Sequence, residues 1–280
     1  MEPEREDAGA LHALEVRLLL EAIHARYGYD LRDYSPPHMK RRLGAALARY
    51  GLPHLGELQH RILHDPSFFA AVLDELTVQV SDLFRDPPFY RAFRERVIPV
   101  LRTYPLLRIW HAGCATGEEA YATAILLTEE GLYDRAQIYA TDLSVQALAQ
   151  AKQGVFAADR AQAFAFNHAR SGAKTDFAHY CTIAYDQLAI SETLRRNILF
   201  FQHNLVSDQA FGEMHVIFCR NVFLYFGPEL RARVIHKFAQ SLCAGGFLCL
   251  GNSEQLSRAE HGREFVEFAS AERVYRSVVD

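Results

Sequence analysis

The chain lacks the features that mark several large classes of protein. No run of apolar residues approaches the ~18–20 that a membrane-spanning helix needs. Basic residues number 30 against 34 acidic ones, and this net charge of −4 excludes the strongly basic surface of a general nucleic-acid binder. We therefore expect neither membrane insertion nor nucleic acid as a partner, and any site for an anion must be local.

Cysteine is sparse and carries no recognisable pattern. The chain has five cysteines, an odd count, and none forms a CxxC pair or a Cys/His cluster with zinc-ligand spacing. They are Cys114, Cys181, Cys219, Cys243 and Cys249. Buried, reduced thiols are predicted, with no metal. The acidic amino terminus differs from a signal peptide, so a cytoplasmic protein is expected.

The pattern of apolar residues changes near residue 78. Up to that point apolar residues recur at helical spacing, which predicts four short helices. Their apolar positions are Leu14, Leu18 and Ala22, then Leu43, Ala46 and Leu47, then Leu58, Ile62 and Leu63, then Phe69, Val72, Leu73 and Leu76. We predict a small helical domain at residues 1–78, followed by a second domain at 79–280.

The second domain alternates apolar runs with helical stretches. After one amphipathic helix at about 89–103, the runs fall at 106–110, 137–140, 198–201, 215–218 and 247–250. This alternation predicts an α/β domain with a mostly parallel sheet covered on both faces. The terminal segment 273–278 predicts an antiparallel edge strand. Residues 156–196 lack a clear helix and indicate an inserted subdomain or lid.

The most informative segment is RIWHAGCATGEEAY, from Arg108 to Tyr121. A strand, a glycine-containing turn and a helix in this order form a ligand site at the carboxyl edge of an open sheet. Neither a P-loop nor a complete GxGxxG is present, and Glu118 and Glu119 would repel phosphate. They suit an ammonium or sulfonium group instead. The alternative is that both acids only complement the helix dipole.

Polar side chains also follow other predicted strands. Asp142 ends the second strand, where an acid commonly accepts hydrogen bonds from ribose hydroxyls. It could instead cap the next helix, a task that Ser144 could share. Asn204 and Asn221 follow later strands, where their amides suit an adenine edge or a carboxylate, although asparagine also forms turns.

Two arginines lie where a carboxylate ligand could be met. Arg85 lies at the junction between the two domains, and Arg220 follows the fourth apolar run. A guanidinium can bind a carboxylate through two parallel hydrogen bonds. The alternative for each is an ordinary salt bridge, and Asp82 and Asp86 lie close to Arg85 in the sequence.

Taken together, six ordered segments resemble the chemotaxis receptor methyltransferase family, CheR. They are TVQVSDLFRDP (77–87), RIWHAGCATGEEAY (108–121), YATDLS (139–144), HNL (203–205), IFCRNVFLYF (217–226) and GGFLCLGNSE (245–254). The resemblance runs from about Asp30 to Tyr275. It implies a class I, Rossmann-like methyltransferase that uses S-adenosylmethionine, leaves S-adenosylhomocysteine, and esterifies specific glutamates on the cytoplasmic helices of chemoreceptors.

The resemblance also implies particular site residues. The cofactor contacts it implies are Gln79, Ser81, Arg85, Glu119, Asp142, Asn204, Leu205, Arg220 and Asn221. The family more often has Asn at the place of Gln79 and Thr at Ser81, and the retained amide and hydroxyl predict retained binding. Arg85 would orient the incoming glutamate, with Arg220 and Tyr225 as weaker candidates for that catalytic role.

A basic cluster in the helical domain suggests a partner surface. Lys40, Arg41, Arg42 and Arg49 lie on the second predicted helix, and His38, Arg42 and Arg49 fall on one side of it. Such a stripe would fit an acidic receptor helix, and its alternative is a solvated face. The segment 156–196 corresponds to the family's small β-subdomain, and the glycine-bearing insertion that binds a receptor tether is not evident there.

Two other functions compete with the first. One is a non-catalytic regulatory module of a signalling complex that only binds S-adenosylmethionine. The other is a small-molecule methyltransferase, which the basic helical domain disfavours. We expect a monomer that acts without a receptor tether.

Overall fold

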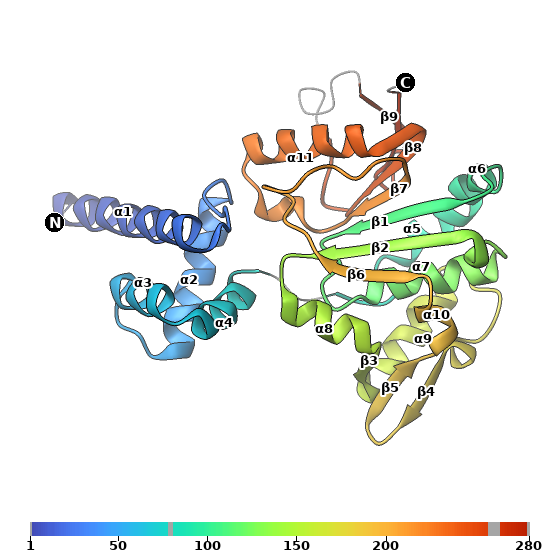
Figure 1. Cartoon of the computed structure of the whole chain (residues 1–280), viewed down its shortest axis with the longest axis horizontal. Coiled ribbons are helices and arrows are strands. Elements are labelled where there is room, and N and C mark those ends of the chain that lie inside the picture. The colour runs from blue at the N-terminus through green and yellow to red at the C-terminus, as the bar shows by residue number, and fades with distance from the viewer. Residues whose placement is uncertain (1, 78–80, 257–263, 279–280) are drawn as a thin grey trace. The chain divides into compact units, whose positions relative to one another are not determined.

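Figure 1 shows the computed structural model of the chain, which describes residues 2–77, 81–256 and 264–278. The chain forms two compact units. The first joins Met1–Val78 to Tyr225–Arg231, and the second joins Gln79–Leu224 to Ala232–Asp280. The main boundary falls where the sequence pattern changes, whereas nothing in the sequence indicates that residues 225–231 belong with the first unit. None of the helices described is both long enough and apolar enough to cross a membrane.

Four helices make up most of the first unit, as the apolar spacing predicts. They are α1 (Glu2–Tyr27), α2 (Pro36–Tyr50), α3 (Leu55–His64) and α4 (Pro66–Leu76). The prediction of four short helices is wrong for α1, which has 26 residues. Apolar residues lie on more than one side of α1, so Leu19 and Ile23 are buried while Leu14 and Leu18 are exposed.

The segment 225–231 packs against the helices of its own unit through backbone and ring contacts. The Ser35 N–H donates to the carbonyl of Tyr225 at 2.8 Å, and the rings of His38 and Tyr225 lie 4.6 Å apart. His38 is only 6% exposed, and its Nε2 is 3.2 Å from the carbonyl oxygen of Leu76. The predicted basic stripe is therefore wrong for His38, which lies on the buried side of α2.

A seven-stranded sheet forms the centre of the second unit. Its strands are β1 (Leu107–Ala112), β2 (Ala136–Asp142), β6 (Ile198–Gln202), β7 (Met214–Cys219), β8 (Leu242–Leu250), β9 (Phe265–Ala269) and β10 (Val274–Ser277). Their order is β6-β2-β1-β7-β8-β10-β9. The first five pair in parallel, and β10 pairs antiparallel with both β8 and β9.

The carboxyl-terminal strand does not lie at the edge of the sheet. The sequence predicts 273–278 as the edge, but β10 lies between β8 and β9. Residues Ser270 to Arg273 turn the chain between the two strands, so β9 becomes the outer strand of a hairpin. The prediction missed β9 because Phe265–Ala269 is exposed at its centre and lacks a strict polar and apolar alternation.

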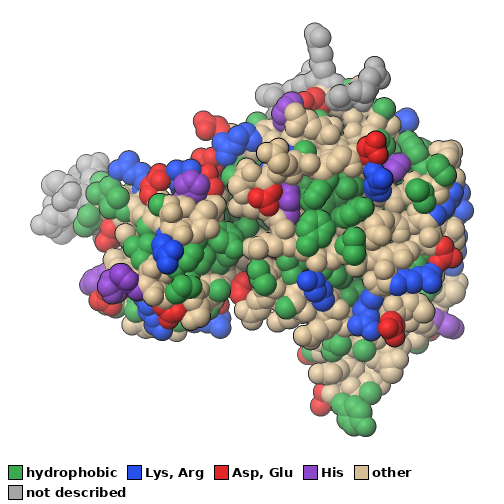
Figure 2. Space-filling view, in the orientation of Figure 1, with side chains coloured by type: hydrophobic (Ala, Val, Ile, Leu, Met, Phe, Trp, Pro, Cys, Tyr) green, Lys and Arg blue, Asp and Glu red, His purple; other side chains and the backbone are tan. Residues whose placement is uncertain are grey.

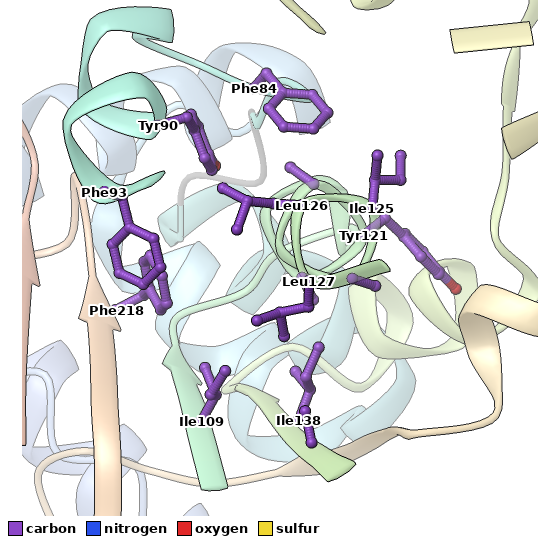
Figure 3. Packing of buried hydrophobic residues seen from close by; sticks show 14 of the residues in the cluster. Phe84, Tyr90, Phe93, Ile109, Tyr121, Ile125, Leu126, Leu127, Ile138 and Phe218 are labelled. Atoms are coloured by element: carbon purple, nitrogen blue, oxygen red, sulfur yellow. The ribbon is translucent and has the colours of Figure 1, made fainter. Parts of the chain in front are cut away.

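Helices cover both faces of this sheet. Ile109 of β1 and Ile138 of β2 lie beneath the apolar side of α7 (Glu118–Glu129), and Phe93 lies beside Phe218 (Figure 3). Trp110 meets Phe238 of α11 (Pro228–Ser241) with ring centroids 5.2 Å apart. The other helices are α5 (Pro87–Ala92), the π-helical turn η1 (Phe93–Val97), α6 (Ile98–Leu101), η2 (Tyr133–Arg135), α8 (Val145–Gln153), α10 (Glu192–Arg195) and η5 (Phe223–Tyr225).

Residues 155–190 form a small subdomain with its own antiparallel sheet in the order β3-β5-β4. Its elements are β3 (Val155–Ala157), η3 (Ala158–Arg160), α9 (Ala161–Arg170), η4 (Phe177–Tyr180), β4 (Cys181–Ala184) and β5 (Gln187–Ile190). The expectation of no clear helix is wrong, because α9 spans ten residues. Buried Arg94 of η1 anchors it, pairing with Glu129 and Glu130 and donating to the carbonyl of Ser171.

The structure bears on two features of the composition, the odd number of cysteines and the nearly balanced charge. All five cysteines are free, and Cys114, Cys219 and Cys249 are buried. On the face drawn in Figure 2, acidic and basic side chains are interspersed and form no broad basic patch.

Candidate functional site

The turn after β1 lies at the carboxyl edge of the sheet and is shaped by its glycine. Gly113 has φ +81°, and a Cβ there would lie 2.6 Å from the side chain of Val222, so only glycine fits. The N–H groups of Gly113 and Cys114 both donate to the carbonyl of Thr141, at 2.8 and 2.9 Å. The turns after β1, β2 and β7 therefore meet at one place.

Asp142 joins two of these turns through its carboxylate. Its Oδ2 accepts a hydrogen bond from the Ala115 N–H at 2.8 Å, and its Oδ1 accepts one from the Ser144 N–H at 3.0 Å. The helix cap is Ser144 itself, whose Oγ accepts from the Ala147 N–H. The alternative interpretation of Asp142 as the helix cap is therefore wrong. Asp142 is 9% exposed, and its carboxylate joins the turns after β1 and β2.

The two acids that open α7 have different partners. Glu118 is fully buried and pairs with Arg160 of the small subdomain at 2.6 Å. Glu119 accepts from Arg220 Nη1 at 3.2 Å, and its other oxygen is 2.9 Å from His111 Nδ1. Both acids do more than complement the helix dipole, and only Glu119 belongs to the cluster around Arg220.

Arg220 is the centre of a buried charge cluster. Its Nη2 donates to Asp86 at 2.8 Å, and its guanidinium carbon lies 4.1 Å from the ring centroid of Phe89. Burial opposes the charge of Arg220, yet the carboxylate of Glu119, together with that of Asp86, raises its pKa. Burial likewise opposes the charge of Glu119, but hydrogen bonding to His111 and the charge of Arg220 hold its pKa below the usual value. Both pKa shifts favour the charged forms, so Arg220 and Glu119 form an ion pair at neutral pH.

Arg85 lies next to this cluster in the sequence but has a different environment. Its side chain is exposed and forms no ion pair within the described part of the chain. The predicted alternative partners are engaged elsewhere, since Asp86 pairs with Arg220 and Asp82 accepts from Asn167 at 3.2 Å. The backbone carbonyl of Arg85 accepts a hydrogen bond from Arg220 Nη1 at 3.3 Å. Arg85 is thus held by its backbone while its guanidinium faces solvent.

The asparagines occupy tight turns, as their alternative interpretation predicts. Asn204 Oδ1 accepts from the Val206 N–H at 2.9 Å. Asn221 has a left-handed backbone with φ +62°. Leu205 is buried, and its carbonyl accepts from Lys237 Nζ. The turn function and a ligand contact are compatible, because the turns place these residues at the carboxyl ends of β6 and β7.

The remaining predicted site residues lie in separate places. Gln79 lies outside the described residues. Ser81 accepts through its carbonyl from Arg160 Nη2 at 2.6 Å. Tyr225 belongs to the first compact unit.

Sequence reasoning missed His111, Arg160 and Glu254. His111 was detectable, because strand alternation places it on the same face as Ile109. Arg160 and its partner Glu118 are 42 residues apart, and Glu254 and Asn221 are 33 residues apart, so no local pattern connects either pair.

Three buried polar atoms around Glu119 have no hydrogen-bond partner among the residues described. They are Tyr90 Oη, His111 Nε2 and Arg220 Nε. A buried polar atom without a partner is costly, so such atoms indicate a ligand or water. Together with Asp142 at the end of β2 and Glu119 in the first turn of α7, these donors and acceptors fit a nucleoside that carries a positive charge. Within the described ranges, no group of three or more His, Cys, Asp or Glu could hold a metal ion.

Comparison with known proteins identifies the class. Residues 79–271 match the family described as "CheR methyltransferase, SAM binding domain", and residues 14–77 match "CheR methyltransferase, all-alpha domain". The chain therefore belongs to the CheR methyltransferase family. It is an S-adenosylmethionine-dependent methyltransferase of the chemotaxis type, and S-adenosylmethionine is its cofactor.

Full-length relatives support this assignment. A Pseudomonas putida protein named "Putative methyltransferase Cher3" is 42% identical over 263 residues, covering 94% of this chain and 96% of the relative. A Listeria monocytogenes "Chemotaxis protein methyltransferase" is 30% identical, covering 84% and 88%. A protein of the same name from Vibrio anguillarum is 27% identical, covering 87% and 90%.

Replacing Asp142 with asparagine tests the ribose assignment. The amide would place an NH₂ group against a backbone N–H and remove the charge. Hydrogen bonds to charged groups contribute about 1.5–3 kcal/mol, so Asp142→Asn should weaken S-adenosylhomocysteine binding about tenfold to hundredfold in calorimetric titration. Asp134→Asn, at an exposed acid paired with Arg196, is the matched control and should bind normally. Unchanged affinity for Asp142→Asn would refute the assignment.

Proposed function

We propose that this enzyme transfers a methyl group to the γ-carboxylate of specific glutamates on the cytoplasmic helices of chemoreceptors. The proposal also places it in the cytoplasm and treats it as a monomer. Membership of the CheR family supports the chemistry and the pathway. The observation that supports a carboxylate substrate is the exposed guanidinium of Arg85. Its acidic neighbours Asp86 and Asp82 already bind other residues. An incoming carboxylate would supply the missing partner.

The residues of the site have distinct tasks in this proposal. S-adenosylmethionine supplies, when bound, a methyl group on a positively charged sulfur. Glu119 would accept hydrogen bonds from the cofactor's amino group, and Asp142 from its ribose hydroxyls. Ser81, Asn204, Leu205 and Asn221 would complete the pocket, with Gln79 as a further predicted contact. The negative charges of Glu119 and Asp142 attract a cation and repel a phosphate group.

The substrate needs no general base. A glutamate carboxylate is already ionised at neutral pH, so the protein has only to orient it and to exclude water. We assign the orientation to Arg85. Arg220 is paired with two carboxylates, and a substrate could bind it only by displacing them. We assign to Arg220 the task of holding Glu119, the acid that would bind the cofactor. Tyr225 stays a weaker candidate for substrate contact.

Incubation with methyl-labelled S-adenosylmethionine and a panel of receptor cytoplasmic fragments tests this function. We expect the label on glutamates of at least one fragment, released by mild base as an ester requires. A fragment whose target glutamates are changed to glutamine is the control and should stay unlabelled. Absence of label with normal cofactor binding would favour the non-catalytic module, and base-stable label would exclude ester formation.

Substitution of Arg85 tests its orienting role. Arg85→Met keeps the length of the side chain and removes its charge and donors. Loss of a bidentate carboxylate contact should lower turnover about tenfold or more, with cofactor affinity changed less than about threefold. Arg96→Met, at another exposed arginine of the same unit, should have normal turnover in the same assay. Normal turnover of Arg85→Met would overturn the assignment.

The basic residues of α2 differ in how well they suit a receptor helix. Lys40 and Arg41 are exposed, Arg42 is half-buried, and Arg49 pairs with Glu75 at 2.5 Å. We propose that Lys40 and Arg41 contribute most to binding an acidic helix, and that Arg42 and Arg49 contribute less. Exposed charges without a fixed partner attract an oppositely charged surface at the lowest desolvation cost.

Charge reversal at Arg41 tests this surface. Arg41→Glu should weaken binding of a receptor fragment at about 0.01 M salt and have little effect at about 1 M, where screening is strong. Arg17→Glu makes the same change at an exposed position of α1 and should have a smaller effect. Surface plasmon resonance at both salt concentrations measures the difference. A loss of affinity that is independent of salt would contradict an electrostatic role.

A further inference from the structure

Glu254 is a buried acid to which neither the family resemblance nor the mechanism assigns a task. It lies four residues beyond the end of β8 and is 2% exposed. Its Oε2 accepts hydrogen bonds from the N–H groups of Asn221 at 2.8 Å and Gly251 at 2.7 Å. The N–H groups of Phe223 and Leu224 also bond to it. One carboxylate thus gathers four backbone donors from two segments.

These donors belong to the loop that carries a predicted cofactor contact. Asn221 has φ +62°, a backbone conformation that residues other than glycine rarely adopt unless their surroundings hold them there. The Glu254 carboxylate supplies that restraint by binding the N–H of Asn221 itself and those two and three residues later. Without it, three N–H groups of this tight loop would lose their acceptor.

Gly251 lets the carboxylate and the asparagine approach each other. A Cβ at Gly251 would lie 2.8 Å from both Asn221 Nδ2 and Glu254 Oε2. The side-chain amide of Asn221 is therefore packed against the end of β8, on the same side as the carboxylate. Glu254 and Gly251 restrict both the backbone and the side chain of Asn221.

The same loop contacts the first turn of the site. Val222 lies so close to Gly113 that a Cβ on the glycine would clash with it at 2.6 Å. A shift of the loop after β7 would therefore disturb the turn after β1 as well. Burial raises the pKa of Glu254, while the four N–H donors favour its charged form.

We propose that Glu254 is a positioning residue for the methyltransferase reaction: by binding the backbone of the loop after β7, it holds Asn221 in the orientation that contacts the cofactor. The proposal rests on the assignment of Asn221 as a cofactor contact within the proposed function. Glu254 itself does not touch the cofactor.

A double-mutant cycle tests this coupling. Glu254→Gln nearly preserves the shape of the side chain. It replaces one carboxylate oxygen, which accepts hydrogen bonds from backbone N–H groups, with an NH₂ group that cannot accept them. It should weaken S-adenosylhomocysteine binding about tenfold, the effect of losing hydrogen bonds to a charged group. In an Asn221→Ala background the same change should cost less than about twofold, because the side chain being positioned is gone. In an Asn204→Ala background the tenfold loss should persist, because Asn204 follows β6 and two strands lie between β6 and β7.

The cycle distinguishes positioning from a general structural role. Equal losses in all three backgrounds would overturn the proposal, because they would show that Glu254 acts without Asn221. If Glu254→Gln does not fold, as judged by circular dichroism, Glu254→Asp replaces it in the same three backgrounds. It keeps the charge but shortens the side chain, and the same pattern of losses is expected.

Failure of this proposal can be told apart from failure of the proposed function. The cycle measures cofactor binding by the whole chain and needs no receptor. The labelling of receptor fragments by the unmodified enzyme reports the function separately. The cycle could thus succeed with an enzyme that methylates another substrate, and fail with one that methylates receptors.

Discussion

The ion pairs of Arg220 are the interaction on which the rest of the site depends. Its guanidinium connects Asp86, which precedes α5, with Glu119 in the first turn of α7. Burying charges is expensive unless each is paired, so removal of one member would leave the others uncompensated. The requirement to keep this cluster paired joins Arg220 to Glu119 and Asp86, which lie 101 and 134 residues earlier in the chain. It also leaves Glu119 charged and directed into the site.

A second constraint is backbone conformation at the carboxyl edge of the sheet. Gly113, Ala115 and Asn221 all have positive φ there, and each is held by a contact to another strand end. Unfavourable backbone conformations persist only where the surroundings determine them, and such positions gather at functional sites. Asp142 and Glu254 act alike in this respect, because each carboxylate binds backbone N–H groups of two segments. Contacts within the protein therefore hold these backbone conformations at the carboxyl edge.

Much of this fold could be predicted from the sequence, for a physical reason. The parallel strands are buried on both faces, and their near-continuous apolar runs make them visible as short hydrophobic segments. The polar residues that follow, such as Asp142 and Asn221, then fall at one edge because parallel strands end on the same side. The sequence did not reveal which partner each charge has. Glu119 and Arg220 are 101 residues apart, and no local pattern connects them. The burial of His38 and the inner position of β10 depend in the same way on long-range packing.

A crystal structure of the enzyme with S-adenosylhomocysteine would test most directly whether the cluster around Arg220 recognises the cofactor. The account predicts the ligand's amino group within hydrogen-bond distance of Glu119 and its ribose against Asp142, with the Arg220 pairs intact. A ligand bound away from the carboxyl edge of the sheet, or one that breaks the Arg220 pairs to reach its site, would contradict it.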